Sequence, residues 1–484
     1  MHLDFDACYR AMIAKDRRFD GVFFVGVKST GIYCRCVCSA RTPKSENCTF
    51  YRSPASAEAA GYRPCLLCRP ERAPGQGRIP APVDAVARLA TLATRRIESG
   101  ALDHGSLTEL AARLGVSARH LRRAVLQTTG LSPVEIAQTQ RLLSAKQLLS
   151  DTKMPVGEVA LASGFRSLRR FQSSFQERYG LSPSDLRRNK QGRVETSLPV
   201  KVRVGYRPPY DWGGLLRFLS IRAIPGVETV DATTYRRTLI WNGEPGWISV
   251  TNLPEKCQLE VTLPENLVPI LRSLLRRVRQ AFDTDCRADL IAESLGQLAA
   301  GHEGLRVPGS LNGFQTAVQA ILGQQVTVAV GVGQAARLAR AFGRPIETPW
   351  SDLNLCFPAS DDLAYADPSE ISEHRILKQR ATAIIGLAKA VQEGLTLDPE
   401  GDSRAVQSAL LEIRGVGHWT AAYIALRVLG DPDSFLPGDA ALRNALGSRD
   451  AKSCELIAEQ WRPWRSYSVM HLWRSLDPTP DLRT

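Results

Sequence analysis

Five cysteines gather in two short stretches near the start of the chain, Cys34, Cys36 and Cys38 in "TGIYCRCVCSA" (30–40) and Cys65 and Cys68 in "YRPCLLCRP" (62–70). Close cysteine pairs separated by a loop are typical of a tetrahedral all-thiolate zinc site, which takes four ligands. The spacing therefore predicts one zinc ion and one surplus cysteine. On spacing alone the site is a structural knuckle, although a zinc-bound thiolate can also be a nucleophile.

A carboxylate is the second candidate for chemistry. In "DSFLPGDAALRNAL" (433–446), Pro437 and Gly438 precede Asp439 and a helical pattern follows it. Asp439 is therefore predicted to cap a helix N-terminus, where the helix dipole stabilises the charged form of a carboxylate. Upstream, the stretch "LLEIRGVGHWTAAYIAL" places Gly415 and Gly417 between two apolar helices. That pattern alone indicates a helix hairpin and nothing more.

A duplicated pattern provides the third group of residues. The stretches 107–133 and 156–183 both read as a short apolar helix, a glycine-centred turn, an arginine-bearing helix and the exit "GLSP". This is a helix-turn-helix signature, whose second helix can lie in the DNA major groove. Two copies with a shared exit favour DNA binding over a merely solvated helical face. The arginines predicted to contact DNA are Arg119, Arg122, Arg123, Arg169 and Arg170.

These residues lie in parts of the chain that differ in composition. Residues 1–200 contain 31 Lys and Arg against 17 Asp and Glu, a net charge of +14, whereas residues 201–484 contain 31 against 32, a net charge of −1. A chain of 484 residues is too long for one ordinary core, so we expect three or more domains. Polar stretches at 71–82 and 188–199 are predicted linkers.

The apolar pattern argues against membrane insertion and secretion. No run of 18 apolar residues occurs, and the N-terminal segment is charged rather than signal-like. We therefore expect a cytoplasmic protein, in which cysteines are free thiols or metal ligands.

The segments "TGIYCR", "ENCTFY" and "AGYRPCLLCRP" resemble the N-terminal domain of Ada-type DNA-repair regulators over residues 5–72. In that family one zinc-bound cysteine irreversibly accepts a methyl group from a methylphosphotriester in DNA. The resemblance implies that Cys34 is the acceptor and that Arg41 contacts the phosphate. The implied zinc ligands are Cys34, Cys38, Cys65 and Cys68, which makes Cys36 the surplus cysteine.

Residues 82–188 resemble the paired helix-turn-helix module of AraC-type transcriptional regulators. The long helical segment "VEIAQTQRLLSAKQLLSD" is similar to the linker helix that holds the two DNA-reading units of that family at a fixed spacing. The resemblance implies promoter binding and transcriptional activation, strengthened when methylation removes a negative charge from the zinc site.

Residues 202–477 resemble 3-methyladenine DNA glycosylases of the AlkA type, in segments such as "RPPYDWGGLLRFLSIRAIPGVE" and "FQTAVQAILGQQVTV". That group belongs to the helix-hairpin-helix glycosylases, so Asp439 is implied as the catalytic carboxylate. Gly415 and Gly417, with a monovalent cation bound by carbonyls, would grip the DNA backbone. Gln325 stands where relatives insert a leucine into DNA. The implied base-binding cleft consists of Phe218, Trp419, Tyr423 and Trp473, which would hold a cationic base by stacking.

These resemblances predict a multidomain protein. Residues 1–75 are expected to form a small α+β zinc domain, and residues 82–188 an all-α double helix-turn-helix domain. Residues 200–290 would form the α+β part of the glycosylase, and residues 291–484 its helical helix-hairpin-helix core.

The implied function is a fusion that senses methylphosphotriesters, activates transcription and excises alkylated purines such as 3-methyladenine. Trp419 stands where strand-cleaving relatives carry a lysine, so a monofunctional glycosylase is expected. Two alternatives stay open: a transcriptional regulator whose C-terminal half is an inactive DNA-binding or sensing module, and a chain whose zinc is purely structural and accepts no methyl group. The expected partners are double-stranded DNA, both damaged and promoter, and RNA polymerase, with no membrane, and we expect a monomer.

Overall fold

The computed structural model describes residues 3–75, 85–188, 199–241, 243–448 and 450–476. The chain divides into two compact units. Unit 1 contains Met1–Gly77, Ala81–Pro208 and Leu253–Arg279, and unit 2 contains Arg78–Pro80, Pro209–Asn252 and Gln280–Thr484. The predicted linkers at 71–82 and 188–199 lie mostly outside the described residues.

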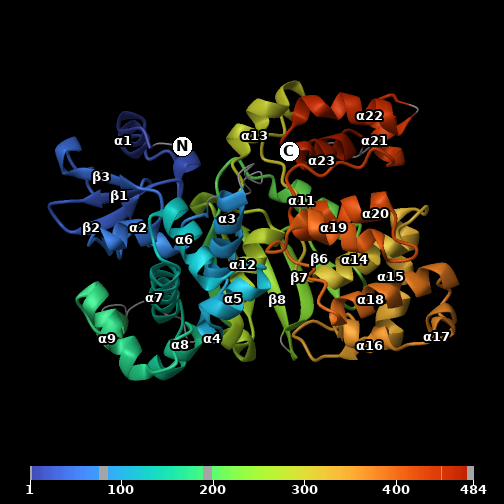
Figure 1. Cartoon of the computed structure of the whole chain (residues 1–484), viewed down its shortest axis with the longest axis horizontal. Helices are drawn as coiled ribbons and strands as arrows, with labels where there is room; N and C mark the ends of the chain where they lie inside the picture. Colours follow the sequence, from blue (N-terminus) through green and yellow to red (C-terminus); the bar gives the residue numbers. More distant parts are fainter. Residues whose placement is uncertain (1–2, 76–84, 189–198, 242, 449, 477–484) are drawn as a thin grey trace. The chain divides into compact units, whose positions relative to one another are not determined.

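Unit 1 begins with a small α+β module (Figure 1). Its elements are α1 (Phe5–Ile13), β1 (Phe24–Val27), β2 (Ile32–Arg35), β3 (Cys48–Tyr51), α2 (Pro54–Ala59) and β4 (Arg63–Pro64). The strand order is β3-β1-β2-β4, antiparallel except for the parallel pair β2 and β4. Cys8 and Met12 from α1 pack with Phe23 and Val25 in a shared apolar core, which fixes α1 on the sheet.

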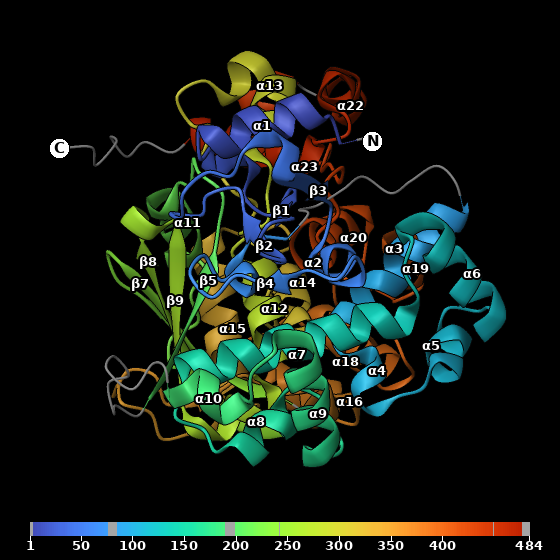
Figure 2. The same ribbon diagram turned by 90° about the vertical axis from the view of Figure 1, so that its left-hand side faces the viewer.

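Helices make up the next part of unit 1. They are α3 (Ala85–Glu98), α4 (Ala101–His104), α5 (Leu107–Arg113), α6 (Ala118–Thr129), α7 (Pro133–Asp151), α8 (Val156–Ala162), α9 (Leu168–Tyr179) and α10 (Pro183–Arg188). Both predicted helix-turn-helix pairs are present, α5 with α6 and α8 with α9, at opposite ends of α7 (Figures 1 and 2). Gly115 and Gly164 adopt φ values of +69° and +84°, which a side chain would strain.

The remaining described part of unit 1 consists of β5 (Val200–Gly205), β9 (Gln258–Leu263) and most of α12 (Leu271–Ala281). The strands β5 and β9 pair in antiparallel register (Figure 2). Arg272 of α12 donates to the Asp103 carboxylate at 2.7 Å and to the carbonyl of Glu98 at 3.0 Å. These bonds tie α12 to the end of α3 and to α4.

A buried network of charges joins the small α+β module (residues 3–75, with the predicted zinc ligands, called the zinc module below) to α7. Lys146 donates to Glu71 at 2.6 Å and to the carbonyl of Cys65 at 3.2 Å. Arg69 also donates to Glu71, at 2.8 Å, and it reaches Asp151 at the end of α7 at 2.5 Å. Burial opposes the charge on Glu71, yet Lys146 and Arg69 outweigh it and lower the pKa of that carboxyl to about 2. The zinc module is therefore held on α7 by ion pairs as well as by apolar contacts.

Unit 2 contains a short sheet and a helical body. Its first elements are α11 (Trp212–Ser220), β6 (Glu228–Val230), β7 (Thr234–Trp241), β8 (Glu244–Leu253) and α13 (Ala288–Leu295). The strand β7 is antiparallel to both β6 and β8. The later elements are α14 (Gly313–Leu322), α15 (Val328–Phe342), β10 (Arg344–Pro345), β11 (Leu355–Cys356), α16 (Ser360–Ala364), α17 (Pro368–Ser372), α18 (Lys378–Gln392), α19 (Ser403–Leu411), α20 (His418–Ile424), α21 (Ala440–Ala445), α22 (Ala451–Ala458) and α23 (Arg465–Ser475).

Two apolar clusters hold the helical body together. One contains Ala317 and Ile321 of α14 with Ile384 and Leu387 of α18. The other joins α13, α21, α22 and α23. Between the clusters, α20 continues into a π-helical turn, Ala425–Leu429, a distortion often found near functional sites. The predicted multidomain fold class is confirmed.

No helix in the described part of the chain combines the length and apolar character needed to cross a membrane.

We expect Glu71→Ala to destabilise unit 1, because the buried ammonium group of Lys146 then loses its charged partner. Breaking a buried ion pair in this way costs about 3–5 kcal/mol. The measurement is the midpoint of denaturant-induced unfolding. A matched control is Glu46→Ala, which removes an exposed partner 4.0 Å from Lys44 and should leave the midpoint unchanged. Equal midpoints for the two variants would contradict a structural role for the network.

Candidate metal centre and candidate cleft

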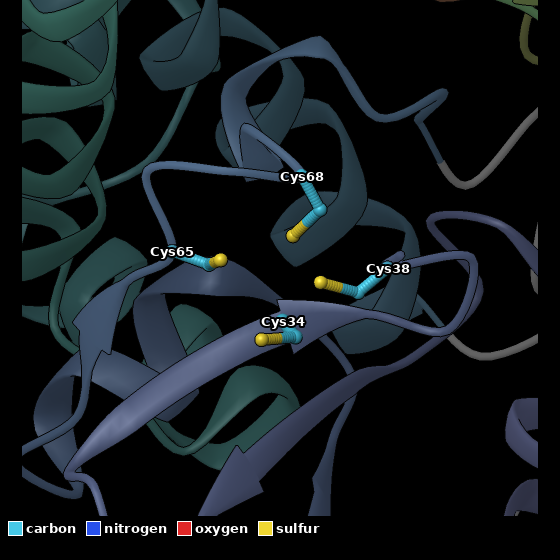
Figure 3. Close-up of side chains that lie close together, drawn as sticks. All are labelled: Cys34, Cys38, Cys65 and Cys68. Carbon is cyan, nitrogen blue, oxygen red and sulfur yellow. The ribbon is translucent and has the colours of Figure 1, made fainter. Parts of the chain in front are cut away.

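Four cysteines converge in the zinc module. The sulfur atoms of Cys34, Cys38, Cys65 and Cys68 lie within 4.8 Å of one another, and Figure 3 shows them directed toward a common centre. Four sulfurs around a tetrahedral zinc ion would be roughly 3.8 Å apart, so this donor set fits one zinc. Cys34 belongs to β2, and Cys65 directly follows β4. The parallel pairing of β2 and β4 therefore brings the two cysteine segments together.

Cys36 lies outside this cluster. Its side chain is 1 % exposed, and it packs with Cys8 and Val25 in the apolar core of the module. Its thiol lies 3.6 Å from the carbonyl of Asp16, and burial raises the pKa of the thiol. The structure thus brings together the four cysteines predicted as ligands and leaves the predicted surplus cysteine in the core.

A charged pair beside the cluster was not anticipated from the sequence. The backbone N–H of Arg35 donates to the Cys68 sulfur at 3.3 Å, and its guanidinium donates to the Cys68 carbonyl at 3.0 Å. The same guanidinium pairs with the Asp20 carboxylate. Contacts of this kind orient a ligand and offset part of the negative charge of a thiolate cluster.

The predicted phosphate and DNA contacts of unit 1 all lie at the surface. Arg41 is exposed on the segment that follows Cys38. The arginines of the two second helices are exposed as well, Arg119, Arg122 and Arg123 on α6 and Arg169 and Arg170 on α9. Ser117 and Ser167 cap these helices by accepting N–H bonds at 3.2 and 3.4 Å. The arginines are therefore presented from the first turns of capped helices.

In unit 2, Asp439 caps α21 as predicted, and its carboxylate also accepts two indole N–H groups. Its Oδ1 accepts the backbone N–H of Leu442 at 3.0 Å and the indole N–H of Trp473 at 3.2 Å. Its Oδ2 accepts the indole N–H of Trp419 at 3.0 Å. The carboxylate is thus fixed by donors from three helices.

Asp439 lines a cleft of about 1510 Å³ together with all four predicted base-binding side chains. Trp419 and Tyr423 stack with ring centroids 5.3 Å apart, and Phe218 and Trp473 stack at 6.1 Å. The cleft therefore combines an anion with flat aromatic faces.

The predicted DNA-gripping residues line the same cleft. Gly415 has a φ of +93°, a backbone conformation that favours glycine, and a Cβ there would lie a tight 3.0 Å from that of Ala383. Gln325 is exposed with a φ of +54°. Its neighbour Gln324 donates to the carbonyl of Gly415 at 3.0 Å and to the hydroxyl of Thr420 at 2.9 Å. Gln324 thus fastens the Gln325 loop to the hairpin of Gly415 and Gly417, a role the sequence did not reveal.

Two arginines at the aromatic end of the cleft were also missed. The guanidinium carbon of Arg222 lies 3.7 Å from the ring centroid of Phe218, and that of Arg427 lies 4.7 Å from it. Arg427, in the π-helical turn, donates to the Tyr423 hydroxyl at 2.8 Å. Although burial opposes ionisation, Arg427 and Arg222 lower the pKa of Tyr423. An arginine inside the apolar stretch "AAYIALRVL" is the signal that could have pointed to Arg427.

Four family models match the chain. They are the metal binding domain of Ada (residues 7–71), a helix-turn-helix domain (110–189), the AlkA N-terminal domain (201–312) and the HhH-GPD superfamily base excision DNA repair protein (318–453).

Curated relatives show the same parts. The probable bifunctional transcriptional activator/DNA repair enzyme AlkA of Mycobacterium tuberculosis H37Rv is 35% identical, over 99% of this chain and 97% of the relative. DNA-3-methyladenine glycosylase 2 of Escherichia coli is 35% identical, over 57% of this chain and 98% of the relative. The bifunctional transcriptional activator/DNA repair enzyme AdaA of Bacillus subtilis is 29% identical, over 38% of this chain and 82% of the relative.

We expect the purified chain to contain one zinc ion, and we expect Cys36→Ala to retain it. Cys38→Ala, which removes one of the four clustered sulfurs, should lose the ion to a competing chelator. Zinc content by elemental mass spectrometry before and after chelator treatment checks both variants. Equal loss from the two would show that the cluster is not the metal site.

Proposed function

The chain belongs to the family of bifunctional transcriptional activator/DNA repair enzymes of the AlkA type, and from that premise we propose that it answers alkylation damage in two ways. One site accepts a methyl group from a DNA methylphosphotriester and thereby activates transcription. The other excises alkylated purines such as 3-methyladenine. The modules proposed for these tasks are residues 1–75, 82–188, 200–290 and 291–484.

Methyl acceptance is assigned to Cys34. A zinc ion held by the four cysteines would keep their thiols deprotonated at neutral pH. The Cys34 sulfur attacks the methyl carbon, a carbon–sulfur bond forms, and the bond from that carbon to the phosphate oxygen breaks. The electron pair stays on the oxygen, which restores an ordinary anionic phosphodiester. Arg41 holds the neutral phosphotriester in line for this displacement.

Methylation would also switch DNA binding. Turning a thiolate into a thioether removes one negative charge from a surface that faces phosphates. Since affinity for the DNA backbone is electrostatic, binding strengthens. The exposed arginines of α6 and α9 then hold a promoter more tightly, and RNA polymerase is the proposed further partner of a monomeric, cytoplasmic regulator.

The observation that supports base excision is the Asp439 carboxylate, fixed by two indoles and a helix cap inside an aromatic cleft. As the bond from the sugar to the base breaks, positive charge develops on the sugar, and Asp439 stabilises it. Asp439 then orients the water that adds to the sugar. The hairpin of Gly415 and Gly417, with a monovalent cation, holds the backbone, and Gln325 contacts the DNA from which the base has turned out.

Cys34→Ala should abolish methyl uptake from phosphotriesters and leave base excision intact, because the two reactions use different modules. Peptide mass mapping after reaction with methylated DNA should show one added methyl group, a mass increase of about 14 Da, on residue 34. Finding the label on Cys36 would overturn the assignment of the acceptor. Cys36→Ala is the matched control and should still be labelled.

Asp439→Asn should lower excision at least about 100-fold, because the charge that stabilises the sugar cation is gone. Fold and DNA binding should survive, since the asparagine oxygen can still cap α21, although its amide nitrogen cannot accept the Trp419 indole N–H as Oδ2 does. Release of 3-methyladenine from alkylated duplex DNA, measured in single turnover, checks this.

The same assay tests the alternative of an inactive C-terminal module, which predicts no release by the unaltered chain. Among the described residues that line the cleft none is a lysine, so the product should be an intact strand with an abasic site. Borohydride trapping of a protein–DNA adduct would contradict the monofunctional mechanism.

A further inference from the structure

The end of the cleft that is lined by aromatic rings also holds positive charge. The guanidinium carbon of Arg222 lies 3.7 Å from the Phe218 ring centroid and 6.0 Å from that of Trp473. Arg427 lies 4.7 Å from the Phe218 centroid and 5.7 Å from that of Tyr423. Both arginines line the cleft. A flipped base that enters between these rings therefore meets two cations.

The two arginines are held differently. Arg427 is buried, and it donates to the carbonyls of Pro308 and Gly309 and to the Tyr423 hydroxyl. Its donors are thus used to fix the π-helical turn. Arg222 is half-buried, and its guanidinium donates to the carbonyl of Phe218 at 3.3 Å and also interacts with the Tyr423 hydroxyl. A guanidinium has five N–H donors, so Arg222 can turn several of them toward a ligand.

This arrangement conflicts with a cleft built only for cationic bases. A cationic methylpurine could stack on Phe218, but the guanidinium of Arg222 covers one face of that ring. Two guanidinium groups also repel a cationic ring, and the charge of arginine persists even where burial lowers the pKa of Arg222. An uncharged damaged purine, in contrast, offers carbonyl and ring-nitrogen acceptors to the same donors.

We propose that Arg222 contacts the base and sets the balance between cationic and uncharged substrates, by stabilising the anion that an uncharged purine becomes as it leaves. The inference rests on the proposed glycosylase function and deepens it. Arg427, in the π-helical turn, adds a second positive charge beside the Phe218 ring.

The electron balance explains why Arg222 would speed the excision of uncharged bases but not of cationic ones. When the bond from the sugar carbon to the base nitrogen breaks, its electron pair goes to the base. A cationic methylpurine thereby becomes neutral and needs no help. An uncharged purine becomes an anion, which the adjacent guanidinium stabilises until water supplies a proton. In both cases Asp439 stabilises the sugar cation, and water then adds to it.

The test compares two duplexes of one sequence, one with a single 7-methylguanine and one with a single deoxyinosine, whose base is uncharged. Single-turnover excision rates are measured for the unaltered chain, for Arg222→Met, which keeps length and apolar packing, and for Arg222→Lys, which keeps the charge. Losing a preorganised donor costs about 10²–10³ in rate. We therefore expect Arg222→Met to lower the deoxyinosine rate about 100-fold and to raise the 7-methylguanine rate, whereas Arg222→Lys keeps most deoxyinosine activity.

Other outcomes separate this inference from the proposed function. If the unaltered chain excises 7-methylguanine but not deoxyinosine, the role of Arg222 is overturned and the glycosylase stands. If Arg222→Met changes both rates by the same factor, Arg222 is only a packing residue and the inference fails. If the unaltered chain excises neither base, the proposed function itself fails. Melting curves show whether Arg222→Met folds; if it does not, Arg222→Gln replaces it in the same comparison.

Discussion

The hydrogen bonding of one carboxylate determines the arrangement of the cleft. Asp439 accepts N–H groups from Leu442 in α21, Trp419 in α20 and Trp473 in α23. A partly buried anion without donors would be costly, so the positions of the three helices are coupled to the need to satisfy it. Because each indole N–H points at Asp439, the orientation of each indole ring is fixed as well. The tryptophans therefore serve as donors that hold the anion, in addition to offering flat surfaces to a base.

Each fixed charge in the cleft is opposite in sign to the charge that the proposed reaction would develop beside it. Asp439 is negative where the sugar would gain positive charge, and Arg222 and Arg427 are positive beside the rings where the base would gain electrons. On the proposed mechanism, charges develop on the sugar and the base as the bond breaks, and fixed charges of opposite sign in the cleft stabilise them. Fixed groups of this kind need no reorganisation during the reaction, which is the main source of electrostatic catalysis. The proposed roles of Asp439 and Arg222 are thus complementary parts of one electrostatic arrangement.

Local signals made some of these features predictable from the sequence. Gly115 and Gly164 mark the helix-turn-helix turns because only glycine adopts their backbone conformation without strain, and Asp439 marks a helix start by its cap. The cysteine spacing predicted a four-thiolate site, and the resemblance to Ada-type regulators selected its four ligands. In contrast, Arg427 donates to carbonyls more than a hundred residues away, at Pro308 and Gly309. The pairs of Arg35 with Asp20 and of Lys146 with Glu71 likewise depend on tertiary packing, which no local pattern encodes.

The two proposed reactions differ in what remains on the protein, and this explains why joining them is useful. On the proposed mechanism methyl transfer leaves a thioether on Cys34, and a neutral thioether does not pass its methyl group on, because a thiolate would have to leave. On that mechanism each chain would record one lesion and then stay in the methylated, DNA-binding state. Base excision leaves nothing on Asp439, so the same chain can excise bases repeatedly. On the proposed mechanism, one chain thus carries both an acceptor that is used once and a catalyst that is used repeatedly.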